Sequence, residues 1–199
     1  PRSTLFPYTT LFRSVFSPDD KRERAKIGQG LWISIDLEGP AGDTIGYRAR
    51  HNAPLVDLAK IGHYDPAEFW EPIKRNRARS LILNPDDFYI LVSREKIRVP
   101  HRYAAEMVPY DTSVGEFRIH YAGFFDPGFG YGGKADIQGT RAVLEVRSHD
   151  VPFLLEHGQV VGRFAFEKLT AKPERIYGSG IGSNYQRQGL TLAKQFRRK

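Results

Sequence analysis

Residues 141–148 are the segment that most restricts how this chain can fold. Every second side chain in it is apolar, and this set is Ala142, Leu144 and Val146. A two-residue period is that of a β-strand with one face in the core. Glu145 lies in the middle of the opposite face, and a carboxylate there is costly to bury unless it is paired or used. The strand alone leaves two interpretations open: Glu145 is a functional group, or it faces solvent beside Arg147.

The rest of the chain indicates an all-β domain with one or two short helices. Thirteen prolines and nineteen glycines separate many short alternating segments, which is typical of strands joined by turns. We predict strands at residues 31–37, 80–83, 88–93, 98–100, 116–121, 141–147 and 160–166. Asp65 can cap a short helix, because Pro66 and Glu68 suit its first positions. This helix should carry Phe69 and Trp70 toward the core.

The composition excludes several classes of protein. The chain has no cysteine, which rules out disulfides, thiolate catalysis and the cysteine-ligated zinc of the better-known cytidine deaminases. His120, His149 and His157 lack the spacing of a metal site, so we expect no metal bound by the protein. No apolar run is long enough to cross a bilayer, so we expect a soluble, cytoplasmic protein without a membrane partner.

Much of the net charge of +7 lies in basic runs toward the two ends of the chain, residues 21–26 and 195–199. We interpret these runs as solvated tails. The sequence shows no recognition helix and no base-stacking motif, so we expect no nucleic-acid partner. The remaining positive charge suits a small polyanionic substrate such as a nucleoside triphosphate.

Five sequence features occur in an order that points to a known family. They are residues 34–37, residues 81–93, the stretch His-Tyr-Ala-Gly-Phe-Phe-Asp-Pro-Gly-Phe at 120–129 followed by the strand at 141–148, residues 158–169, and residues 177–189. Together they resemble the dCTP deaminase branch of the dUTPase-like superfamily, from about Gly30 to about Lys194. The resemblance implies a distorted β-barrel of jelly-roll type that assembles as a homotrimer. It also implies hydrolytic deamination of dCTP to dUTP and ammonia, with Mg²⁺ accompanying the triphosphate and no zinc.

The resemblance further assigns roles to individual residues. Glu145 falls at the position of the glutamate that activates water, and the backbone carbonyl of Ala122 at the position that helps to hold this water. Asp126 falls where the 3′-hydroxyl of the deoxyribose is bound, and Phe129 lies near the sugar. The arm that folds over the triphosphate corresponds to Tyr177, Tyr185 and Gln188. Composition alone explains the Asp126 segment equally well as an ordinary turn.

The chain departs from the family pattern at its phosphate-binding segment. Residues 108–114 lack both arginines of the family motif, and Asn184 stands where the family has lysine. These departures suit the carboxyl-terminal half of a longer, two-domain bacterial subclass, in which the missing arginines come from the other half or from a neighbouring subunit. Two alternatives stay open: a dUTP diphosphatase of the same fold, and a non-catalytic half that completes a trimer. The presence of Glu145 favours deamination over the first.

The chain divides into four expected parts. Residues 4–14 read as the translation of a sequencing-adapter oligonucleotide, so we interpret 1–14 as an artefactual leader on a truncated metagenomic reading frame. Residues 15–27 are predicted to be a charged linker, 28–176 the dUTPase-like β-barrel domain, and 177–199 a flexible C-terminal arm.

Overall fold

The computed structural model describes residues 15–17, 30–39, 44–109, 117–120, 124–131, 137–148, 150–178 and 189–198. Ten of its twelve strands belong to two antiparallel sheets. The first, which we call the β10 sheet, contains in spatial order β4 (Trp70–Lys74), β3 (Thr44–Ala49), β6 (Phe88–Ile97), β10 (Thr140–Ser148) and β8 (Phe117–His120), with β1 (Val15–Phe16) also paired to β6. The second, the β12 sheet, contains β2 (Leu31–Ser34), β12 (Val160–Lys168), β7 (Tyr103–Pro109) and β9 (Phe124–Phe125).

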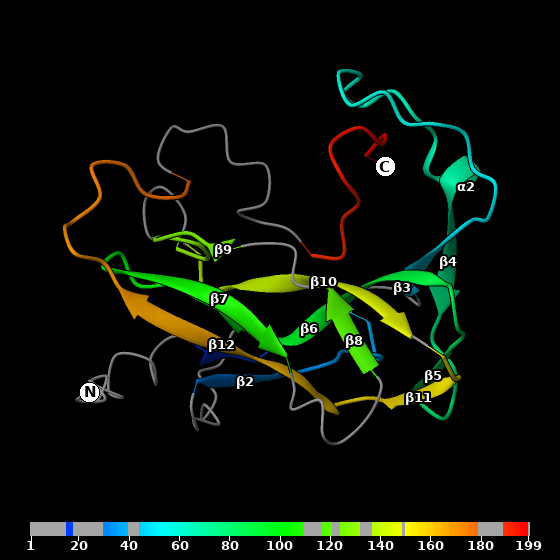
Figure 1. Ribbon diagram of the computed structural model, residues 1–199, viewed down its shortest axis with the longest axis horizontal. Coiled ribbons are helices and arrows are strands. Elements are labelled where there is room, and N and C mark those ends of the chain that lie inside the picture. The colour runs from blue at the N-terminus through cyan, green and yellow to red at the C-terminus, as the bar shows by residue number, and fades with distance from the viewer. Residues whose placement is uncertain are drawn as a thin grey trace.

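The two sheets pack against each other over one hydrophobic core (Figure 1). Leu31 and Phe164 enter this core from the β12 sheet, and Leu91 and Leu144 enter it from the β10 sheet. A separate antiparallel pair, β5 (Ser80–Leu83) with β11 (Phe153–Glu156), extends the core at one end. This architecture confirms the predicted all-β class. No helix in the described part of the chain is long and apolar enough to cross a membrane.

Strand β10 has the predicted alternation. Ala142, Leu144 and Val146 are fully buried in the core, while Val143 and Glu145 are half-buried on the opposite face. We call this opposite face of the β10 sheet its outer face. Because β10 pairs with β6 on one side and β8 on the other, its backbone is fixed from both sides. Glu145 is therefore held at a defined position on the outer face.

The predicted short helix is present as α2 (Pro66–Phe69). The Asp65 side chain accepts a hydrogen bond from the backbone N–H of Ala67 at 2.9 Å, as the cap predicts. Phe69 is buried. Trp70 differs from the prediction, because its backbone is already extended and it begins strand β4. Its side chain consequently lies on the outer face of the β10 sheet rather than in the core.

Several strands were not predicted, and one predicted strand is absent. Residues 98–100 form no strand; a turn follows instead, closed by a hydrogen bond from Tyr103 N–H to the Pro100 carbonyl at 2.9 Å. Strand β3 was missed because Gly46 and Arg48 interrupt its apolar pattern. A Cβ at Gly46 would lie 2.4 Å from the Leu91 side chain, so only glycine lets β3 approach β6 this closely.

Residues 15–17 are part of the β-sheet domain, which corrects the predicted boundary of the linker at 15–27. Val15 and Phe16 pair with Ile97 and Lys96 of β6, and both are only 2% exposed. The guanidinium group of Arg98 lies over the Phe16 ring at 4.8 Å, a cation–π contact. Residues 15–17 therefore belong to the domain, because their apolar side chains find a place on a distant strand. Residues 1–14 and 18–29 lie outside the described residues.

Two truncations test this boundary. If residues 1–14 are an artefactual leader, their removal should change the free energy of unfolding by no more than about 0.5 kcal/mol, the usual limit for a surface tail. Removal of residues 1–17 should cost on the order of 3 kcal/mol, because two apolar side chains leave the core while little ordering entropy is recovered. Urea unfolding of both truncated proteins measures the difference. Equal stabilities would show that β1 does not contribute.

Candidate functional site

A cavity of about 420 Å³ opens on the outer face of the β10 sheet. Its walls come from β4, β6, β9, β10, the turn after β9 and the C-terminal segment. The lining residues are Trp70, Phe88, Ile90, Phe124, Phe125, Asp126, Phe129, Val143, Glu145, Tyr177, Thr191, Leu192 and Ala193. Two carboxylates thus stand among mostly aromatic and aliphatic side chains. We call this space the first cavity.

Glu145 supplies one of these carboxylates from the floor of the cavity. It is flanked across the sheet by Ile90 of β6 and by the backbone of His120 in β8. Among the described residues, none forms a hydrogen bond or ion pair with the Glu145 side chain. The alternative interpretation placed Glu145 in solvent beside Arg147. The guanidinium group of Arg147 instead lies over the Phe88 ring at 5.0 Å. Glu145 is therefore a half-buried carboxylate whose acceptor atoms no described residue engages.

Asp126 stands on the turn that follows β9. The Phe129 N–H donates to the Asp126 carbonyl at 3.0 Å, and the Gly128 N–H donates to the Val99 carbonyl at 3.0 Å. Gly128 has φ = +93°, a conformation that glycine adopts without strain. The turn is thus an ordinary one in its backbone, as composition predicted, but it is anchored to the domain. Its carboxylate is exposed at the rim of the cavity.

Phe129 and Tyr177 form the aromatic end of the cavity. Phe129 is buried, and its ring centroid lies 5.0 Å from that of Phe125 and 5.7 Å from that of Tyr177. The Tyr177 N–H donates to the Pro127 carbonyl at 2.8 Å, so residues 50 positions apart meet at the turn. The structure therefore brings together four predicted site residues, Glu145, Asp126, Phe129 and Tyr177. Ala122, Tyr185 and Gln188 lie outside the described residues.

The C-terminal segment closes one side of the cavity, in contrast to the predicted flexible arm and solvated tail. Gln195 and Phe196 are buried. The Phe196 ring packs against Phe69 and Trp70, with centroids 5.3 and 6.1 Å away. In Figure 1 this segment, drawn in red, runs toward the loop before α2. Residues 189–198 are docked because an aromatic side chain within the basic run finds an aromatic cluster.

Backbone hydrogen bonds fix the docked segment further. The N–H groups of Gly62 and His63 donate to the carbonyls of Lys194 and Gln195 at 2.9 Å each, and the Arg197 N–H donates to the Tyr64 carbonyl at 2.9 Å. Residues 191–193 are thereby held against the first cavity. Sequence reasoning missed them and Trp70 as site residues. The one signal for the docking was an apolar aromatic, Phe196, inside a charged tail.

A buried ion pair between Asp36 and Arg141 lies outside the cavity. Both side chains are less than 5% exposed. Arg141 also donates to the Ser93 carbonyl at 3.2 Å, and Asp36 accepts from the N–H groups of Glu38 and Gly39 at 2.9 and 3.2 Å. His157 sits beside this pair and accepts a hydrogen bond from the Leu37 N–H at 3.1 Å, a structural rather than a ligating environment. Sequence analysis did not predict the pair.

A second polar network surrounds Asp87 at the start of β6. Burial raises the pKa of Asp87, but hydrogen bonds outweigh it, and the pKa is lowered from its usual value. The donors are Tyr89 at 3.0 Å, His51 at 2.8 Å and Asn84 at 3.3 Å. Within the described residues, no group of three or more His, Asp or Glu side chains is arranged to hold a metal ion.

Comparisons with known proteins show the family of this chain. Residues 13–196 match the sequence profile of the family described as 2'-deoxycytidine 5'-triphosphate deaminase (DCD), C-terminal domain. A curated relative from Beutenbergia cavernae, named dCTP deaminase, dUMP-forming, is 29% identical over 180 residues, covering 85% of this chain and 88% of the relative. A relative of the same name from Corynebacterium glutamicum strain R is 30% identical over 153 residues, covering 71% and 75%.

A solved structure is also similar to this chain. The crystal structure of 2'-deoxycytidine 5'-triphosphate deaminase from Agrobacterium tumefaciens superposes with a TM-score of 0.67 and 56% sequence identity. The match covers 73% of this chain but 43% of the solved chain, so this chain spans less than half the length of that relative. The likeness confirms the predicted dUTPase-like β fold.

Proposed function

The chain belongs to the family of the 2'-deoxycytidine 5'-triphosphate deaminase C-terminal domain, and we propose that its first cavity carries out the hydrolytic deamination of dCTP. The observation that carries this proposal is the half-buried carboxylate of Glu145 on the floor of an aromatic cavity, where no described residue forms a hydrogen bond or ion pair with it. Deamination at C4 of cytosine requires a base that takes a proton from water and returns protons to the ring and to the leaving amine. A single positioned carboxylate can perform these transfers.

In the proposed reaction, Glu145 accepts a proton from water while the oxygen bonds to C4, and then passes this proton to the ring N3. The carboxylate next takes the proton of the new C4 hydroxyl group and gives it to the amino group. The C4–N bond breaks as ammonia leaves and the C4 carbonyl forms, so dCTP plus water becomes dUTP plus ammonia. The Ala122 carbonyl would help to hold the water. No metal is proposed at the base; Mg²⁺ enters as the counter-ion of the substrate triphosphate.

The other predicted residues would bind and orient the nucleotide. Asp126, on the rigid turn, would accept a hydrogen bond from the 3′-hydroxyl of the deoxyribose. Phe129 and Tyr177 form the apolar wall beside it, where the carbon face of the sugar would pack. We also propose that Tyr185 and Gln188 contact the triphosphate. Assembly as a trimer is a further part of the proposal.

The product distinguishes deamination from its rivals. The proposed step yields dUTP, whereas the curated relatives are named for dUMP, which forms when the bond between the α- and β-phosphates is also cleaved. The chain is incubated with Mg²⁺ and either dCTP or dUTP in separate reactions, and ammonia and nucleotides are measured. Ammonia with dUTP or dUMP supports the proposal, and the nucleotide decides the product. Conversion of dUTP without ammonia release from dCTP would indicate the diphosphatase. No turnover of either nucleotide would indicate the non-catalytic half.

A further inference from the structure

A second cavity of about 570 Å³ lies beside the first on the outer face of the β10 sheet. It is covered by the docked C-terminal segment and lined by Thr44, Tyr47, Asp65, Pro66, Ala67, Trp70, Pro72, Lys74, Leu190, Thr191, Leu192, Ala193, Phe196, Arg197 and Arg198. Trp70 and residues 191–193 line both cavities. The two cavities therefore adjoin along one shared wall.

The pairing of the strands gives the distance between Glu145 in the first cavity and Tyr47 in the second. Glu145 is in register with Ile90, Ile90 with Tyr47, and Tyr47 with Pro72. Register partners in antiparallel strands point to the same face, so these side chains form a row across four strands. Tyr47 is two strand spacings from Glu145, about 10 Å. A nucleoside triphosphate with its base at Glu145 can span this distance.

The charges of the two cavities are opposite. Among the described residues, the side chains lining the first cavity include two carboxylates, Asp126 and Glu145, and no lysine, arginine or histidine. Those lining the second include three cations, Lys74, Arg197 and Arg198, and one carboxylate, Asp65, which already caps α2. A phosphate chain should be repelled from the first cavity and attracted to the second, because like charges repel and opposite charges attract.

Donors in the second cavity remain available to a ligand. The Lys74 ammonium group contacts a neutral partner, the Thr44 hydroxyl, at 3.0 Å. Among the described residues, none accepts a hydrogen bond from the backbone N–H groups of residues 190–193. A third cavity, lined by Arg48, Arg50 and His51, differs because its cations are paired with Glu71 and Asp87. Of these three cavities, the second therefore combines room, cations and backbone amides that have no acceptor among the described residues.

We propose that the second cavity binds the phosphate chain of a nucleoside triphosphate whose base lies in the first cavity. Lys74 and Arg197 would contact the phosphate oxygens, and the amides of residues 190–193 would donate to them along the shared wall. This inference rests on the proposed function for the identity of the base. In the second cavity, cations from β4 and the docked C-terminal segment would take the place of the arginines that residues 108–114 lack.

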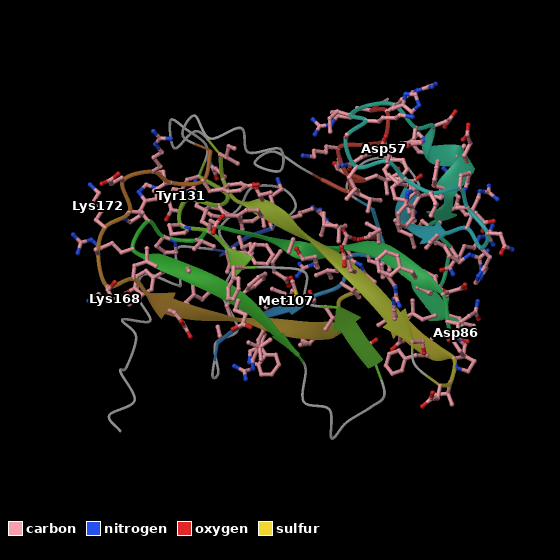
Figure 2. The ribbon with its side chains drawn as sticks, turned by 45° about the horizontal axis from the view of Figure 1, so that its top comes forward. Asp57, Asp86, Met107, Tyr131, Lys168 and Lys172 are labelled. Carbon is pink, nitrogen blue, oxygen red and sulfur yellow. The ribbon has the colours of Figure 1, made fainter. Side chains whose placement is uncertain are left out.

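Binding of inorganic tripolyphosphate to the whole chain tests the site without relying on catalysis. Calorimetry compares the wild type with Lys74→Gln, Lys74→Arg and a control, Lys172→Gln. Lys172 is exposed and lies at the opposite end of the molecule from Asp57 (Figure 2), whose loop holds the C-terminal segment through the bond from Gln195 to the Leu58 carbonyl. The dissociation constant should rise about tenfold in Lys74→Gln, as loss of one charged hydrogen bond implies. Lys74→Arg and Lys172→Gln should stay near the wild type.

Turnover gives an independent readout. The KM for dCTP should rise about tenfold in Lys74→Gln while kcat changes little, because Lys74 would hold the phosphates rather than the reacting ring. Equal tripolyphosphate binding by the wild type and Lys74→Gln, or no binding at all, would overturn the proposal even if dCTP is deaminated. Weakened binding in Lys74→Gln without any deamination would uphold the phosphate site and refute the deaminase activity of this chain.

Discussion

Replacing Glu145 with Gln should lower the rate of dCTP deamination by roughly a hundredfold to ten-thousandfold, the usual contribution of a general acid–base group. Glutamine keeps the size of the side chain and its place on β10, so the sheet is undisturbed. It lacks the carboxylate that accepts the proton from water. The rate is measured as ammonia release from dCTP, together with a thermal unfolding curve that confirms folding.

Two further measurements separate the chemistry from binding. The affinity of the Glu145→Gln variant for dCTP should stay close to that of the wild type, because the sugar and phosphate contacts lie on other residues. Zinc-specific chelation should leave the wild-type rate unchanged, whereas removal of Mg²⁺ should lower it through the triphosphate. A folded Glu145→Gln variant that deaminates dCTP at a near-normal rate would remove Glu145 from the mechanism and return it to the solvent-facing interpretation.

The second large effect is expected at the buried ion pair. Asp36→Asn should reduce the free energy of unfolding by about 3–5 kcal/mol, because it leaves the charge of Arg141 buried without a partner. The amide oxygen of Asn can still accept from the N–H groups of Glu38 and Gly39, so the charge is the main change. For a domain of this size the melting temperature should fall by roughly 10 °C.

The exposed ion pair between Glu38 and Arg79 provides a matched control. Glu38 pairs with Arg79 at 3.2 Å, and both side chains are more than 40% exposed, so Glu38→Gln should change stability by less than about 1 kcal/mol. Combining Asp36→Asn with Arg141→Met should recover part of the loss, since the unpaired charge is then removed. Wild-type stability in Asp36→Asn, or no coupling between the two positions, would show that the pair is not stabilising.

The sequence by itself determined the local structure and the family. The alternation of residues 141–148 placed Glu145 opposite the core, and the Asp65–Pro66 pair specified the start of α2, because each depends on neighbours within a few residues. The ordered features from residue 34 to residue 189 identified the family, whose profile the chain matches. Four site residues proposed on that basis, Glu145, Asp126, Phe129 and Tyr177, line one cavity, while their roles stay predictions.

Only the tertiary structure decided which distant residues meet. Asp36 and Arg141 are 105 positions apart, and nothing near either one signals a buried partner. Phe196 and Trp70 form a shared aromatic cluster although one was expected in a solvated tail and the other in the core. Val15 and Phe16 join β6 for the same reason: apolar side chains in short segments take their burial from strands that lie far along the chain. Strand register, which sets these meetings, follows from the packing of whole sheets rather than from any local pattern.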